Sequence, residues 1–177
     1  GESVNMHDVG HGKVIGGGFP VGMYGGRSAL LDLVAPTGPV YQAGTLSANP
    51  VGMRAGLATL EQMVERNGWN TLDGRTEDFT ASLERRFLDA NLNLEIVRHT
   101  SIFWIRRRTA MPIRRPDHIP GEQAKWYARF FHAALAGGIY LPPSPYEVCF
   151  TSMAHDETVL AEAADVLVDA AVAAERG

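Results

Sequence analysis

The segment at residues 12–22 restricts this chain most, because it places one lysine among five glycines in the run GKVIGGGFPVG. Glycine has no Cβ, so its backbone can turn sharply and lie close to a flat ligand. A lysine amine held beside such a backbone can attack a carbonyl and form a Schiff base. The chain has only two lysines, Lys13 and Lys125, which makes Lys13 the candidate nucleophile. Taken alone, the segment is also compatible with an ordinary glycine-rich turn beside a solvated lysine.

Two phosphate-binding motifs are excluded here. A P-loop needs a glycine five residues before its Gly-Lys pair and a Ser or Thr after it, but the chain has His7 and Val14 at those positions. The dinucleotide motif G-x-G-x-x-G begins at Gly10 and Gly12, and then Ile15 stands in place of the third glycine.

The bulk composition is that of a globular domain, or part of one, with 177 residues, 45% apolar and 20% charged. A net charge of −4 argues against a nucleic-acid or anionic-membrane partner. The single cysteine, Cys149, excludes an internal disulfide and fits a reducing compartment, so we expect a cytoplasmic location. We expect no membrane span and no signal peptide. His7 and His11 have a metal-ligand spacing, but the glycines beside them disfavour a helix, and no metal is expected.

Helical spacing of apolar residues predicts helices at residues 28–34, 50–66, 76–91 and 121–136, and a last helix capped by Asp156. Strands are expected at residues 23–26, 94–97, 102–105 and 139–141, with one more fed by the loop at 144–155. We expect apolar stripes on the long helices at Met53, Leu57, Leu60 and Val64; at Phe79, Leu83 and Phe87, with Leu88; and at Trp126, Phe130 and Ala134. A composition shift near residues 67–75 indicates a boundary between a glycine-rich segment and an α+β segment.

Two further places carry candidate site residues. Gly44 and Thr45 precede a helix start at Asn49 and Pro50, where free N–H groups and a hydroxyl can hold a phosphate. An ordinary capped loop is the alternative there. Glu147 is a carboxylate in an apolar setting, and is either a paired structural residue or a site residue.

Three motifs together resemble one family. The lysine segment, followed by GGR at residues 25–27, is similar to the pyridoxal-phosphate lysine segment of class III aminotransferases. The loop GPVYQAGTLSANP at 38–50 resembles the next loop of the glutamate-1-semialdehyde 2,1-aminomutase family. The runs RFFH at 129–132, GIYLPPS at 138–144 and SMAH at 152–155, with Glu147 between the last two, resemble the C-terminal segment of that family.

The resemblance implies an α/β fold, a fold-type-I pyridoxal-phosphate (PLP) dependent transferase. Residues 1–70 would be the end of the large PLP-binding domain, and residues 71–177 the α+β C-terminal small domain. Lys13 would form the Schiff base with PLP and move protons. Gly44 and Thr45 would contact the cofactor phosphate of the neighbouring subunit of a homodimer. Glu147 would be an active-site carboxylate.

The implied reaction converts a small amino aldehyde, glutamate-1-semialdehyde, to 5-aminolevulinate for tetrapyrrole synthesis, with the pyridoxamine phosphate form in the cycle. Two departures from the family pattern are residues 1–11, which lack its Pro-Asp-Leu strand, and Ala48, which replaces a usual glycine. The larger N-terminal part of the family, with its further cofactor-binding residues, is absent from this sequence. Two other functions stay open: a class III transaminase acting on another amino compound, and a non-catalytic remnant.

Overall fold

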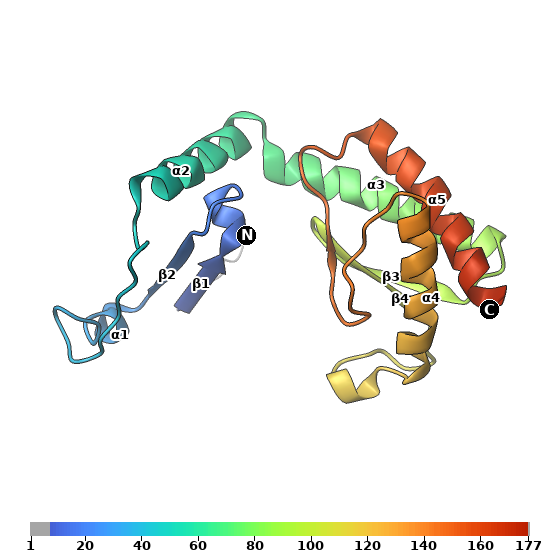
Figure 1. Ribbon diagram of the computed structural model, residues 1–177, viewed down its shortest axis with the longest axis horizontal. Coiled ribbons are helices and arrows are strands. Elements are labelled where there is room, and N and C mark those ends of the chain that lie inside the picture. Colours follow the sequence, from blue (N-terminus) through green and yellow to red (C-terminus); the bar gives the residue numbers. More distant parts are fainter. Residues whose placement is uncertain (1–7, 177) are drawn as a thin grey trace, which may run out of the picture. The chain divides into compact units, whose positions relative to one another are not determined.

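The computed structural model describes residues 8–176, and for residues 8–11 and Lys13 it describes the backbone alone. The chain divides into two compact units, one ending at Asn67 and the other beginning at Gly68. Each unit has its own helices and its own sheet (Figure 1).

The first unit is built on a two-stranded antiparallel sheet of β1 (Asp8–Gly12) and β2 (Gly22–Gly26). The 3-10 helix η1 (Lys13–Gly16) follows β1 directly, and Gly12 is paired with Gly22. The sequence did not predict β1. This strand has two glycines and no apolar alternation, so its conformation depends on pairing with β2 rather than on local propensity.

Two helices complete this unit, α1 (Ser28–Leu31) and α2 (Pro50–Glu65). The predicted start of α2 is confirmed, because the side chain of Asn49 accepts a hydrogen bond from the Gly52 amide at 2.9 Å and Pro50 is the first helical residue. The buried residues of α2 are Gly52 and Gly56. Its expected apolar stripe is 40–68% exposed among the described residues, and comprises Met53, Leu57, Leu60 and Val64.

The second unit packs three long helices on a three-stranded antiparallel sheet of order β3-β4-β5. Its elements in chain order are α3 (Gly68–Asp89), β3 (Leu94–His99), β4 (Ile102–Arg107), the 3-10 helix η2 (Pro116–His118), α4 (Glu122–Ala136), β5 (Cys149–Phe150) and α5 (Glu157–Arg176). This mixed composition agrees with the expected α+β architecture.

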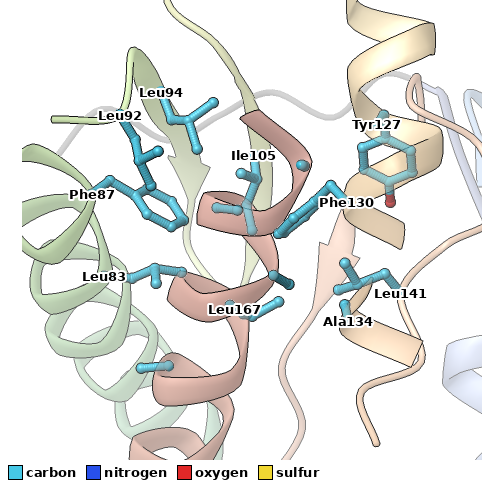
Figure 2. Packing of buried hydrophobic residues seen from close by; sticks show 14 of the residues in the cluster. Leu83, Phe87, Leu92, Leu94, Ile105, Tyr127, Phe130, Ala134, Leu141 and Leu167 are labelled. Atoms are coloured by element: carbon cyan, nitrogen blue, oxygen red, sulfur yellow. The ribbon is translucent and has the colours of Figure 1, made fainter. Parts of the chain in front are cut away.

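The core of the second unit lies where the helices meet one face of this sheet. Figure 2 shows Phe87 of α3, Phe130 of α4 and Leu167 of α5 gathered around Ile105 of β4. The predicted stripes on α3 and α4 are confirmed, whereas Leu88 is exposed. The stripes are buried because residues three or four apart share one helix face.

Two predicted elements of this unit are wrong. Helix α3 begins at Gly68 rather than near residue 76, because its buried face already includes Gly68 and Leu72. Residues 139–141 are not a strand. The Ile139 amide donates to the Ala134 carbonyl at 2.9 Å and so completes the end of α4. The predicted cap of α5 is confirmed, since the Asp156 carboxylate accepts from the Val159 amide at 2.9 Å.

No helix within residues 8–176 is both long and apolar enough to cross a membrane.

Candidate functional site

Lys13 is the first residue of η1, directly after the strand that pairs with β2. The turn that follows it is held by its own backbone: the Gly17 amide donates to the Val14 carbonyl at 3.2 Å, and the Phe19 amide to the Gly16 carbonyl at 3.1 Å. Gly17 has φ +59°, a left-handed conformation that favours glycine. The role predicted for Lys13 depends on its side chain, which is outside the part of the chain that the structure describes.

Helix α2 packs against this turn, through the backbone at Gly56 and through the Thr59 side chain at Gly17. A Cβ added at Gly56 would be 2.8 Å from the Ile15 carbonyl oxygen, and one added at Gly17 would be 2.1 Å from Thr59 Oγ1. Gly56 and Thr59 were not predicted from the sequence as residues that support the lysine segment. The four-residue spacing of Gly52 and Gly56 was a visible signal, because glycines at that spacing share one helix face.

Gly44 and Thr45 lie at the turn before α2, in the loop that the sequence predicted. The Ser47 amide donates to the Gly44 carbonyl at 2.9 Å, and Thr45 is exposed. Gly44 also lines a cavity of about 690 Å³ together with residues of β2, so it shares a hollow with the strand that returns from the lysine segment. The rest of its lining is Pro20–Tyr24, Gln42, Leu46–Asn49 and Met53. Thr45 is not among the lining residues.

Glu147 belongs to the second unit, on the loop before β5. It is exposed, and its amide donates to the Ser144 carbonyl at 3.3 Å. Among the described residues, no cationic side chain forms an ion pair with its carboxylate. It lines a groove of about 610 Å³ that also includes Tyr140, Cys149 and His155.

Burial raises the pKa of two groups in the second unit. It raises the pKa of the Cys149 thiol to about 12, so the thiol is a poor nucleophile. Burial first, and then the negative charges of ionised Cys149 and Glu147, hold the pKa of Tyr127 well above its usual value. The Tyr127 hydroxyl donates to the Pro142 carbonyl at 2.7 Å, a structural contact.

Among the side chains that the structure describes, no three candidate metal ligands form a cluster. His7 of the spaced histidine pair lies outside the described residues.

Solved structures with the same fold are transaminases. An omega-transaminase from Sphaerobacter thermophilus superposes with a TM-score of 0.80 at 26% identity, over 96% of this chain and 39% of that one. A transaminase with PLP bound gives a TM-score of 0.78 at 24% identity, over the same shares of the two chains. The chain therefore has the fold of the corresponding part of fold-type-I PLP-dependent transaminases.

Curated relatives narrow this class. The glutamate-1-semialdehyde 2,1-aminomutase of Bdellovibrio bacteriovorus is 53% identical over 163 residues, which is 92% of this chain and 38% of the relative. That of Leptospira interrogans is 52% identical over 159 residues, 89% of this chain and 36% of the relative. Within its class, the chain is thus a relative of the glutamate-1-semialdehyde 2,1-aminomutases and matches their C-terminal portion. It spans less than two fifths of their length. No protein-family model matches the sequence.

Proposed function

We propose that this chain supplies the cofactor lysine and the phosphate-contacting loop of a PLP-dependent aminomutase, an isomerase that converts glutamate-1-semialdehyde to 5-aminolevulinate in porphyrin biosynthesis. The observation that carries the proposal is the 53% identity to a curated aminomutase over 163 residues. Because the chain spans 38% of that relative, the activity is proposed for the complete protein that contains this chain.

The described residues fit the cofactor. Lys13 opens a tight turn in which an added Cβ at Gly12 or Gly18 would meet nothing within 4 Å, and Gly44 lines a cavity next to β2. The exposed Thr45 precedes the N-terminus of α2, where the helix dipole favours a phosphate. Bound PLP supplies an electron sink for negative charge on the substrate carbon and, in its pyridoxamine form, the transferred nitrogen.

Each residue then has one task. The Lys13 amine would bind the cofactor and move protons between cofactor and substrate carbons. Thr45, with the Gly44 backbone, contacts the cofactor phosphate of a second copy, which makes the active protein a homodimer. Glu147 is the active-site carboxylate contributed by the second unit.

The same proposal covers the organisation of the chain. Residues 1–70 form the end of the large cofactor-binding domain, and residues 71–177 form the small domain. The partners are a small amino aldehyde and a second subunit, without nucleic acid or membrane, and the protein works in the cytoplasm. An ordinary transaminase acting on another amino compound is the second candidate, favoured by the likeness to the omega-transaminase at 26% identity. A non-catalytic remnant is the third.

Reductive trapping tests the cofactor claim. The complete protein is incubated with PLP, unbound PLP is removed, and the protein is reduced with borohydride. After digestion, mass spectrometry shows whether the Lys13 peptide carries a pyridoxyl group. We expect the adduct on Lys13 and its loss in Lys13→Ala, with Lys125 unmodified as the internal reference. A folded wild-type protein without the adduct would contradict the proposal.

Substrate assays then separate the candidates. Conversion of glutamate-1-semialdehyde to 5-aminolevulinate without a second amino donor supports the aminomutase. Trapping on Lys13 combined with amino transfer between two different substrates would instead show the transaminase.

A further inference from the structure

The lysine segment packs directly against helix α2. The buried glycines of the helix form the contact surface. Gly52 and Gly56 are the buried residues of α2, and Thr59 follows on the same face. At Gly56 the nearest atom to an added Cβ is a backbone carbonyl, that of Ile15 at 2.8 Å. Ile15 is two residues from Lys13 and lies within η1.

A backbone carbonyl cannot rotate away as a long side chain can. A methyl group at residue 56 would therefore move the η1 backbone, or move α2 away from it. At Gly52 the atoms nearest to an added Cβ belong to side chains, Val21 Cγ2 and Asn49 Nδ2, both at 3.0 Å. A methyl group there requires a smaller adjustment, at the far end of the turn.

Gly17, the residue that ends η1, makes a second contact with α2. Its left-handed backbone lies next to Thr59, whose Oγ1 atom donates to the Ala55 carbonyl at 2.9 Å. The C-terminal end of the 3-10 helix that begins with Lys13 is thus held against α2 at two neighbouring points.

We propose that Gly56 is a positioning residue for Lys13. By allowing backbone contact between α2 and η1, it sets the direction in which the Lys13 amine meets the cofactor. The inference rests on the proposed role of Lys13, and it concerns a residue that touches neither cofactor nor substrate.

The test compares two modifications of Lys13 in the complete protein. Reductive trapping with PLP requires the amine to meet a ring that is held in place. Reductive methylation with formaldehyde requires only an accessible amine, and Lys125 serves as the reference lysine in both reactions. Gly56→Ala is compared with Gly74→Ala, a matched control in helix α3 where an added Cβ meets nothing within 4 Å.

For Gly56→Ala we expect PLP trapping at Lys13 to slow by about tenfold or more, since a small misplacement of a reacting group costs up to about a hundredfold. Formaldehyde methylation of Lys13 should stay within about twofold of wild type, because it needs no orientation. Gly74→Ala should match wild type in both. Gly52→Ala, the milder variant, should give an intermediate loss of trapping and replaces Gly56→Ala if that variant does not fold.

Equal PLP trapping in wild type and Gly56→Ala would overturn the inference and leave the proposed function standing. A parallel change in both reactions would also overturn it, because it would indicate general loosening of the unit. No trapping in wild type would instead overturn the proposed function and, with it, the role of Gly56. Amide exchange at Gly17 gives a reading without cofactor: it should rise in Gly56→Ala, and unchanged exchange would count against the inference.

Discussion

Thr76 and Thr151 are joined by a buried hydrogen bond of 2.6 Å between their Oγ1 atoms, although 75 residues separate them. Thr76 Oγ1 donates to the Leu72 carbonyl at 2.6 Å, so Thr151 Oγ1 is the donor in the bond between the two hydroxyls. The Ser101 carbonyl accepts from the Thr151 amide at 2.9 Å. This chain of bonds ties the segment after β5 to the middle of α3, within the unit that contains Glu147.

Thr151→Val should lower the free energy of unfolding by about 1 kcal/mol, because valine keeps the shape but removes the buried hydrogen bond to Thr76. Urea denaturation followed by circular dichroism measures the change. Thr151→Ser retains the hydroxyl and should lose less. Equal losses in the two variants would show that the methyl group, and not the hydrogen bond, matters here.

Ala48→Gly should stabilise the first unit by about 0.5–1 kcal/mol, because Ala48 has φ +53°, where an L-residue with a side chain is strained. Hydrogen exchange in residues 44–60 measures the local effect. Ala128→Gly, at an exposed position within α4, makes the same chemical change with the opposite expected sign, a loss of about 1 kcal/mol. A destabilising Ala48→Gly would refute the strain argument.

Alkylation of Cys149 by iodoacetamide at pH 8 should be on the order of 10²–10³ slower in the folded chain than in denaturant, because only the thiolate reacts. The pKa of the thiol rises from 9.0 to about 12 on burial. Since the folded state favours the neutral thiol, its contribution to stability is complete below pH 9 and declines as pH rises toward 12. Similar rates in the folded and unfolded chain would contradict the burial of this group.

Neighbouring residues of α3 should respond very differently to truncation. Phe87 is fully buried and Leu88 is 55% exposed. Phe87→Ala should cost about 3–5 kcal/mol through the cavity it leaves, whereas Leu88→Ala should stay within about 0.5 kcal/mol. Thermal unfolding of the two variants against wild type checks this. Comparable losses would mean that the second unit is not packed around Phe87.

Local chemistry in the sequence predicted much of this structure. Asn49 and Asp156 were identified as helix caps because a cap needs only a few adjacent residues. The stripes of α3 and α4 followed from spacing alone. Helix α3 was expected to start late because Asp73-Gly74 is a common turn pair, but an added Cβ at Gly74 meets open space and the buried face continues past it.

The features that sequence reasoning missed depend on distant contacts. β1 is a strand because β2 pairs with it. Ile139 is not part of the sheet, because its amide donates to the Ala134 carbonyl at the end of α4. The lysine segment was identified from its glycines. Its contact with α2 was not predicted, because a glycine within a helix indicates from sequence only a low helix propensity. Only the fold shows that Gly56 is opposite the Ile15 carbonyl.

The glycine face of α2 also predicts a pattern of mutational tolerance. In most helices the constrained positions are the large apolar ones, and the small residues accept change. Here Gly56 has no room for a single methyl group, while Leu57 beside it is 46% exposed within the described chain. In a saturation screen of this chain, we therefore expect Gly56, a position without a side chain, to tolerate substitution least of all positions in α2.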